Sequence, residues 1–487
     1  MNWLDAIPYR STVMPVLPVY VISFVLFSLI LVSLDTPFDQ DGYFHLRIAE
    51  SPARFLGAEN FPWMSASIYN EHYADKCILY HLMIHLFYLL RLDSLTLLIP
   101  AFTGSFLLAY VYYFLRRFDV RYPCIWTFLV LLISSDFFLR LLMIRPHVLS
   151  IVCALICVQF LLNGNYRLLA ILAFLYVFTY SSYHLLLMLS FLYVMCHYIY
   201  YRRLDFTPFV LTFISLGFGI LLHPHFPDNF IIWKVNTIDV FVLDLLFVDL
   251  DLIVELLPAG PHFLLLENFF LFFPIPGLLL WTLSRSAQVS FQSIYLLLVC
   301  FIFLCMTMFA VRFIEYWALF SVLTAAFLVR DLHLTDALRK GQKLGILIVV
   351  FFLYFYNFVD TKIQFGQYHF PDLQNVSSWI KNSEQIQPGE IIFHDSWDYF
   401  PQLFYFNTEN RYLFGLDPIF LFAYDREKYE TWRAVSDGSA QNIRAILEDF
   451  NSRVILIRNS NTRLHETLLN EQFHLLFEDE FVSLFAT

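Results

Sequence analysis

Long apolar segments alternate with short polar segments through most of this chain. A helix needs about 20 apolar residues to cross a bilayer. Apolar segments of this kind, several of them shorter, lie at 15–34, 77–90, 95–115, 124–139, 146–162, 168–180, 185–200, 208–223, 263–283, 290–310, 312–329 and 344–360. The pattern predicts an α-helical polytopic membrane protein with about 11–13 transmembrane helices.

The pattern changes after residue 361. Short apolar runs alternate there with helical periodicity, which is typical of a small α/β domain. We expect helices near 371–381, 425–435 and 439–450, and strands over 390–394, 411–415, 453–458 and, as a pair, around 473–485. The predicted domains are a transmembrane domain over 1–361, with external loops 35–76 and 224–262, and an external α/β domain over 362–487.

Composition supports a membrane location. Hydrophobic residues make up 59% and charged residues 15% of the chain, whereas soluble domains carry about 25% charged residues. The seven cysteines lie in apolar segments, so neither a disulfide framework nor a zinc site is expected. The formal net charge of −11 lies mostly in the tail and argues against nucleic acid as a partner.

Basic loops predict the orientation, because cytoplasmic loops collect Lys and Arg. These loops are 116–121, 201–203 and 330–343. With them inside, the segments 140–147 and 224–262 and the C-terminal tail lie outside. We therefore predict a multi-pass protein of the bacterial inner membrane with a periplasmic C-terminal domain.

Two carboxylates, Asp39 and Asp41, follow the first apolar segment, and His45 comes one helical turn later. A carboxylate at the membrane surface can act as a general base, stabilise positive charge on a reacting sugar, or bind a divalent metal. The alternative is that the aspartates only cap a helix that starts at Tyr43. Ionisable groups at this depth usually mark function.

Arginines in apolar surroundings form a second set of candidates. Arg145, followed by His147, and Arg312 both lie on the predicted outer side, where a phosphate is a natural partner. The alternatives are snorkelling of Arg145 to the interface and a local salt bridge from Arg312 to Glu315. We place His45 and His147 with the substrate-binding residues.

The segment 38–47 resembles a stretch of the catalytic subunit of oligosaccharyltransferase and of the wider GT-C membrane glycosyltransferases. In that family an acidic residue follows the first transmembrane helix in a Phe-Asp-x-Tyr-Phe-x-x-Arg-like pattern. The resemblance implies a GT-C type fold, with Asp41 as the catalytic carboxylate and Asp39 supporting it. It also implies that an arginine of a late helix, here Arg312, contacts the donor phosphate.

Two weaker likenesses concern the acceptor. The stretch 252–258 resembles a Val-x-Glu-x-x-Pro pattern and assigns Glu255 to the acceptor region, although a solvated carboxylate is the simpler interpretation. The stretch 395–400 resembles the family's Trp-Trp-Asp-Tyr-Gly signature. Trp397, Asp398 and Tyr399 are retained and are expected to bind acceptor, whereas Ser396 and Phe400 replace the first Trp and the Gly.

The family's second acidic motif has no counterpart in 136–147. This absence favours a metal-independent transferase in which arginines bind the phosphate. Asp41 remains the candidate ligand if Mg²⁺ or Mn²⁺ binds.

These features predict a membrane glycosyltransferase that moves a sugar or oligosaccharide from a polyprenyl-phosphate-linked donor to a glycan, lipid or protein acceptor on the external face. Membrane lipid is the other expected partner. Two alternatives remain open. One is a transporter or flippase of a lipid-linked or anionic substrate, and the other is a non-catalytic assembly subunit.

Overall fold

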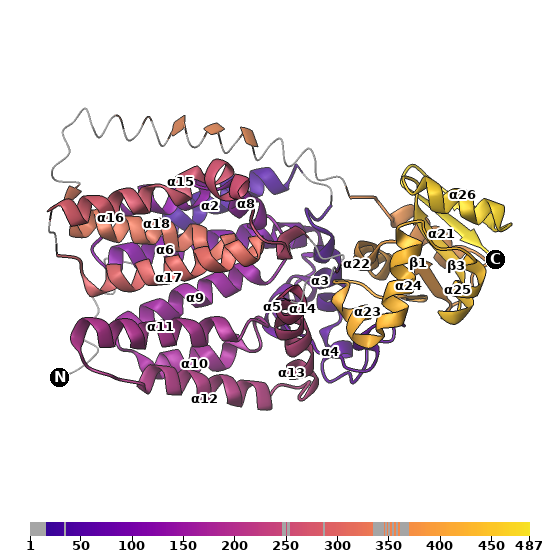
Figure 1. Cartoon of the computed structure of the whole chain (residues 1–487), viewed down its shortest axis with the longest axis horizontal. Coiled ribbons are helices and arrows are strands. Elements are labelled where there is room, and N and C mark those ends of the chain that lie inside the picture. Colours follow the sequence, from indigo (N-terminus) through magenta and orange to yellow (C-terminus); the bar gives the residue numbers. More distant parts are fainter. Residues whose placement is uncertain are drawn as a thin grey trace. The chain divides into compact units, whose positions relative to one another are not determined.

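The computed structural model describes residues 16–33, 36–245, 250, 254–285, 288–334, 345, 348, 351–352, 355–356, 359–360 and 370–487. Most of the predicted segment 344–360 therefore lies outside the described residues. Contacts divide the chain into two compact units. Unit 1 comprises Met1–Thr36, Leu97–Gly219 and Val254–Tyr368, and unit 2 comprises Pro37–Thr96, Ile220–Ile253 and His369–Thr487 (Figure 1).

Unit 1 is helical. Its elements are α2 (Val16–Leu31), α6 (Ile99–Arg117), α7 (Pro123–Leu132), α8 (Ser135–Arg140), α9 (His147–Leu162), α10 (Tyr166–Tyr176), α11 (His184–Tyr201), α12 (Thr207–Leu221), η4 (Val254–Leu256), η5 (Phe263–Glu267), α15 (Phe269–Phe272), α16 (Pro274–Arg285), α17 (Phe291–Phe309), η6 (Val311–Phe313) and α18 (Ile314–Asp331). In the described part of the chain, four helical stretches are long and apolar enough to cross a membrane, namely Asp93–Arg117, α11, α17 and Val311–Asp331. Six shorter apolar helices accompany them.

The centre of unit 1 is α18, whose residues 314–328 are all buried. In Figure 1, α6, α9, α11 and α17 run alongside one another, and α18 packs on α17. Outer helices instead expose large apolar side chains, as Leu17 on α2 and Phe213 on α12 do. Such an arrangement suits a bundle surrounded by lipid tails, because exposed apolar side chains cost nothing there.

One predicted helix is divided in two. The apolar segment 124–139 forms α7 and α8, because Ser134 adopts an extended backbone conformation and accepts a hydrogen bond from the amide of Phe137. Serine is common at the N-cap position, because its hydroxyl accepts a hydrogen bond from an amide in the first turn of the helix. The break allows α8 to end at Arg140 shortly before α9 begins.

Arg330 joins three elements at the end of unit 1 where α18 finishes. Its guanidinium donates to the carbonyl of Phe118 at 2.9 Å and to the hydroxyl of Ser290 at 2.8 Å. The adjacent Asp331 accepts from the hydroxyl of Ser293 at 2.6 Å. The basic loop after α6 and the start of α17 are thus tied to the end of α18.

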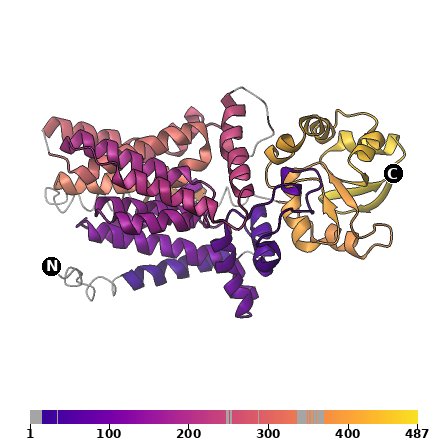
Figure 2. The ribbon, with the colours of Figure 1, turned by 90° about the horizontal axis from the view of Figure 1, so that it is seen from below.

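Unit 2 combines helices with a five-stranded sheet. Its helical elements are α3 (Gln40–Glu50), α4 (Pro52–Phe55), η1 (Ile68–Asn70), α5 (Ile78–Leu89), η2 (Asp93–Leu98), α13 (Asp228–Trp233), η3 (Lys234–Asp239), α14 (Val240–Leu245), α21 (Gln374–Asn382), η7 (Trp397–Tyr399), α22 (Phe400–Phe406), α23 (Ile419–Tyr424), α24 (Arg426–Ser436), α25 (Ile443–Asp449) and α26 (Thr462–Asn470). The strands are β1 (Ile391–His394), β2 (Arg411–Tyr412), β3 (Ser452–Arg458), β4 (His474–Glu478) and β5 (Val482–Ala486). Their order is β2-β1-β3-β5-β4, and Figure 2 shows them, in orange and yellow, surrounded by helices.

The sheet is mixed. Strands β2, β1 and β3 are parallel, whereas β5 runs antiparallel to both β3 and β4. The expected strands at 390–394 and 453–458 are confirmed as β1 and β3, and the expected final pair is confirmed as β4 and β5. A small C-terminal α/β fold is therefore correct, although α22, α23 and α26 were not predicted.

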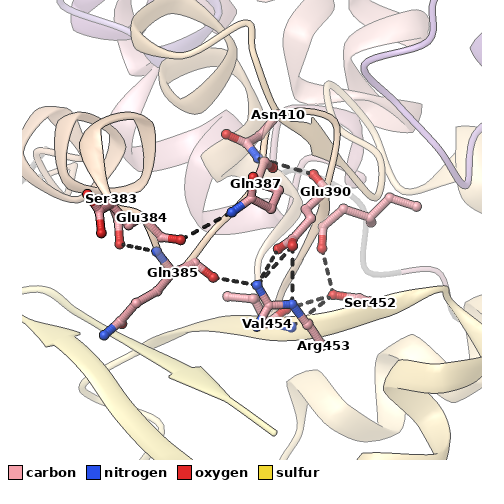
Figure 3. Close-up of polar contacts among 10 residues, drawn as sticks. Ser383, Glu384, Gln385, Gln387, Glu390, Asn410, Ser452, Arg453 and Val454 are labelled. Atoms are coloured by element: carbon pink, nitrogen blue, oxygen red, sulfur yellow. Dashed lines mark hydrogen bonds and ion pairs between the residues drawn. The ribbon is translucent and has the colours of Figure 1, made fainter.

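The start of the sheet is fixed by Arg453 (Figure 3). Its guanidinium lies 2.8 Å from a carboxylate oxygen of Glu390 and donates to the carbonyl of Gln385. The hydroxyl of the neighbouring Ser452 donates to the carbonyl of Ile391 at 2.7 Å. These contacts lie where the register between β1 and β3 shifts, so polar side chains compensate for the irregular ladder.

Part of the predicted external loop 35–76 pairs with the edge of this sheet. The amides of Ser65 and Ala66 donate to the carbonyls of Tyr412 and Leu413 at 2.8 and 2.7 Å, and the amide of Tyr412 donates to Trp63. The contacts therefore group segments 37–96 and 220–253 with the C-terminal part of the chain. The domain boundary expected after residue 361 stays a prediction.

Candidate functional site

Three arginines of unit 1 come from neighbouring helix ends. Arg140 is the last residue of α8, Arg145 lies in the turn before α9, and Arg312 lies in η6 directly before α18. The first turns of α9 and α18 carry partial positive charge, because their amides lack helical partners. Cationic side chains and helix N-termini thus occur together here.

Two glutamates meet these arginines. Glu315 lies 2.9 Å from Arg140, with the side chains 1% and 8% exposed. Glu255, in η4, lies 3.1 Å from Arg140 and 3.0 Å from Arg145. Burial alone would raise the pKa of Glu255, but the two guanidinium groups lower that pKa well below its usual range, so this carboxylate is ionised.

Two further contacts hold the site together. The guanidinium of Arg312 donates to the hydroxyl of Tyr180 at 3.1 Å. The Nε2 atom of His147 lies 2.8 Å from the carbonyl of Arg140 and so donates a hydrogen bond to it. His147 therefore supports the turn that carries Arg140.

We call Arg140, Arg145, Arg312, Glu255 and Glu315 the arginine–glutamate cluster. Three guanidinium groups face two carboxyl groups, so the formal net charge of the cluster is +1. An excess of positive charge between apolar helices favours an anionic ligand, and arginine matches phosphate geometry well. The cluster can therefore bind a phosphate.

Sequence reasoning identified only part of this cluster. Arg145, Arg312 and Glu255 were singled out, and the structure brings them together. Arg140 and Glu315 were not proposed as functional, and Glu315 bonds to Arg140 where a local bridge to Arg312 had been the alternative. The signal for Arg140 was the same as for Arg145, a cation in an apolar stretch.

The acidic segment belongs to unit 2, where it opens α3. This helix begins at Gln40, earlier than the start at Tyr43 that the capping alternative assumed. Asp39 occupies the N-cap position and is buried, but its side chain makes no capping hydrogen bond. Asp41 lies in the first turn and is partly exposed. Capping alone therefore does not account for a buried Asp39.

His45 lies one turn after Asp41 on α3. Its Nδ1 atom is 2.9 Å from Nε2 of His81, which belongs to α5. His85, four residues after His81, instead contacts the carbonyl of Ala49 at 2.8 Å through its Nδ1 atom. The two α5 histidines thus have different partners, as expected for polar groups buried between helices.

The candidate acceptor residues follow β1. Trp397, Asp398 and Tyr399 form η7 at the carboxyl end of that strand. Trp397 and Asp398 are partly exposed, and Asp398 accepts a hydrogen bond from Ser396. Tyr399 is buried in the core of unit 2, so only the first two side chains can face a ligand from this position.

A metal site receives little support from the side chains. Among the residues that the structure describes, no group of three or more His, Cys, Asp or Glu side chains gathers in a way that could hold a metal ion. Asp39 and Asp41 offer two carboxylates at most.

Comparisons with known proteins identify the fold. No family model matches the sequence. No curated protein matches it either. The oligosaccharyltransferase of Archaeoglobus fulgidus in its apo form matches with a TM-score of 0.66 at 14% identity, over 91% of this chain and 69% of that one.

A second group of similar structures is matched over almost the whole of both chains. ArnT from Cupriavidus metallidurans in the apo state matches with a TM-score of 0.56 at 12% identity, over 96% of this chain and 97% of that one. ArnT bound to undecaprenyl phosphate matches with a TM-score of 0.54 at 13% identity, over 96% and 98%. The chain is an integral membrane protein with the fold of these solved structures, which is of the GT-C type.

Proposed function

We propose that this protein is a membrane glycosyltransferase that transfers a sugar or oligosaccharide from a polyprenyl-phosphate-linked donor to an acceptor on the external face of the membrane. The arginine–glutamate cluster is the observation that carries the proposal, because it places a net positive charge at helix N-termini in apolar surroundings. Arg145 and Arg312 hold the phosphate of the donor.

The charges that develop in such a transfer match the residues at hand. The bond between the sugar and the phosphate oxygen breaks, so negative charge grows on the phosphate and positive charge on the sugar. Arginines stabilise the leaving phosphate. Asp41 acts as the base or stabilises the charge on the sugar, and Asp39 supports it.

The similar structures support this donor class. ArnT has been described bound to undecaprenyl phosphate, and the archaeal oligosaccharyltransferase AglB in complex with an inhibitory peptide and a dolichol-phosphate. Both ligands join a phosphate to a long isoprenoid chain. We assign unit 2, through Trp397 and Asp398, to the binding of a glycan, lipid or protein acceptor.

The orientation belongs to the same proposal. The basic residues Arg116, Arg117 and Arg330 lie at the end of unit 1 where α6 and α18 finish, whereas the arginine–glutamate cluster lies where α9 and α18 begin. If the basic end faces the cytoplasm, the cluster faces outward. We therefore propose that transfer takes place on the periplasmic side of a bacterial inner membrane.

Binding of undecaprenyl phosphate to the full chain in lipid nanodiscs tests the proposal. We expect Arg145→Gln and Arg312→Gln each to weaken binding about 10- to 100-fold, the usual loss for a hydrogen bond between charged groups. Arg167→Gln, at an exposed arginine of α10, is the matched control and should not change it.

Undecaprenol, which lacks the phosphate, separates binding of the headgroup from binding of the tail. It should bind all three variants and the unchanged protein alike. Equal affinity of the unchanged protein for both lipids would overturn the proposal. Movement of a lipid-linked sugar across the bilayer without any transfer would favour a flippase instead.

A further inference from the structure

A chain of hydrogen bonds links three side chains of unit 2. The carboxylate of Asp75 lies 2.8 Å from Nδ1 of His81, and Nε2 of His81 lies 2.9 Å from Nδ1 of His45. Asp75 and His81 are buried, whereas His45 is partly exposed. The chain therefore runs from a buried charge to a residue that solvent can reach.

The bonding partners fix the proton on each ring. The other oxygen of Asp75 accepts from the amide of Cys77 at 2.9 Å. Burial alone would raise the pKa of Asp75, but His81 and this amide lower it, so Asp75 is an ionised acceptor. A neutral His81 then donates from Nδ1, and its Nε2 is left as an acceptor.

The proton on the ring of His45 depends on its bond to His81. Because Nε2 of His81 accepts, the Nδ1 atom of His45 must carry a proton and donate it. In a neutral imidazole the other nitrogen, Nε2, then holds a lone pair. The network thus sets His45 up as a base with a buried carboxylate behind it.

His81 is the group that can balance the negative charge of Asp75, because the other basic groups nearby do not. His223 and His225 also lie near Asp75, but burial lowers the pKa of both, that of His223 to about 4, so they are neutral at neutral pH. Lys76 lies over the rings of Tyr69 and Phe420, at 5.8 and 5.3 Å from the ring centres. Neither His223 nor His225 therefore carries a positive charge that would balance Asp75 before His81 takes up a proton.

The groups that face His45 come from α3 and α5. The ring of Tyr80 meets it edge-on, with centres 5.4 Å apart, and Phe44 of its own helix meets it at 5.8 Å. Asp41 lies one turn earlier on the same side of α3. Packed against α3 from α22 are aromatic rings, among them Tyr405, which meets Tyr43.

We propose that His45 accepts the proton of the acceptor's nucleophile and that His81 and Asp75 are positioning residues that hold His45 in its basic form. This inference rests on the proposed function and deepens it. It assigns the acceptor a nucleophile that loses a proton on attack, a hydroxyl or an amine. Asp41 is then left to stabilise charge on the sugar.

The nucleophile forms a bond to the anomeric carbon with its lone pair, and the bond from that carbon to the phosphate oxygen breaks, with its electrons leaving on the polyprenyl phosphate. The proton of the nucleophile passes to Nε2 of His45. The resulting imidazolium is stabilised through His81 by the charge of Asp75, and the proton later leaves to water.

The proton positions can be measured without any substrate. We would label the histidines of the full chain with ¹⁵N, reconstitute it in liposomes, and record solid-state NMR spectra, with His45→Gln and His81→Gln to assign the two rings among the 15 histidines. We expect both rings to carry their proton on Nδ1 at neutral pH. A proton on Nε2 of His45 would overturn the proposal.

A pH titration of the same samples tests the link to Asp75. Asp75→Asn removes a negative charge, so the imidazolium of His45 becomes less stable and its titration midpoint should fall by about one pH unit. His85→Asn is the control, because its amide can still donate to the carbonyl of Ala49. An unchanged midpoint in Asp75→Asn would show that the chain is not coupled.

Turnover completes the test, with undecaprenyl-phosphate-linked hexoses as the probe and release of undecaprenyl phosphate as the readout. His45→Gln should lower turnover about 100-fold or more, as loss of a general base does. Asp75→Asn should lower it about 10-fold and move the acid limb of the pH profile to lower pH. Full turnover in His45→Gln would sink the inference.

The two proposals can fail separately. None of these variants alters the arginine–glutamate cluster, so binding of undecaprenyl phosphate by the unchanged protein tests the donor class separately from the proton chain. If the unchanged protein binds no undecaprenyl phosphate, the proposed donor class is wrong whatever the histidines show. If it binds and turns over but the rings carry the opposite tautomers, only the proton chain is wrong.

Discussion

The guanidinium of Arg140 lies 2.9 Å from the carboxylate of Glu315, and both side chains are almost excluded from solvent. The two residues come from different helices, α8 and α18, and lie far apart in the sequence. An ion pair at this depth stabilises a fold only while both partners are present, because a lone buried charge is costly.

Glu315→Ala should therefore destabilise the protein strongly. Loss of one partner of a buried pair costs about 3–5 kcal/mol when the remaining charge is left desolvated, and Glu255, which still faces Arg140, should keep the loss near the lower end of this range. Thermal unfolding in detergent measures this as a lower midpoint. Glu50→Ala is the matched control, because Glu50 pairs with Arg47 at the surface and should give a change near zero.

Glu255→Gln should tighten phosphate binding. The change removes a negative charge that faces Arg140 and Arg145, so the charge of the cluster rises from +1 to +2. We expect about tenfold higher affinity for undecaprenyl phosphate, measured by titration in nanodiscs. Glu267→Gln, at an exposed carboxylate that pairs with His262, should have no effect. Weaker binding in Glu255→Gln would instead mean that Glu255 orients the arginines.

Asp136 should make stability depend on pH. Burial raises its pKa from about 4 to about 6, so the folded state binds a proton that the unfolded state has lost. The stability that this proton provides is complete below the unfolded pKa and is lost as the pH rises through about 6. Asp136→Asn should remain neutral at every pH.

The difference between the two proteins isolates this group. The free energy of unfolding of Asp136→Asn, obtained from thermal unfolding, should exceed that of the unchanged protein by about 1–3 kcal/mol at pH 8. At pH 4 the two free energies should be nearly equal. Asp93→Asn, at an exposed aspartate, provides the control. A gap that is the same at both pH values would contradict the assignment.

Gly415→Ala should disturb the core of unit 2. A Cβ atom at this position would lie 2.2 Å from Cβ of Phe400, far inside contact distance. Overpacking of this kind costs about 1–3 kcal/mol or more, because the buried ring of Phe400 has nowhere to move. Gly217→Ala is the control, since nothing lies within 4 Å of its Cβ position and alanine favours its helix. Limited proteolysis and thermal unfolding would report the difference.

Periodicity predicted the helices and strands well because it reports burial directly. It could not predict the break at Ser134, which depends on one side chain capping an amide. It also extended the second strand to Gly415, although the close approach of that residue to Phe400 belongs to tertiary structure. Short helices such as α23 lack enough turns for a clear period.

The candidate site was predicted unevenly for a similar reason. Arg145 and Arg312 stand out as cations among apolar residues, so the sequence alone suggests them. The partners Glu315 and His81 look like ordinary polar residues of helices until the fold brings them to Arg140 and Asp75. Their roles depend on which distant residue they meet, and no local pattern contains that information.

The pairing of Ser65 and Ala66 with Tyr412 and Leu413 limits how this protein can be dissected. A fragment that starts at residue 370 would leave the backbone groups of β2 open, and an open strand edge invites other chains to pair with it. Such a fragment should self-associate. A fragment that also keeps the segment around Met64, which bridges to Tyr412, would cover this edge, so residues 37–96 and the C-terminal sheet are expected to fold together.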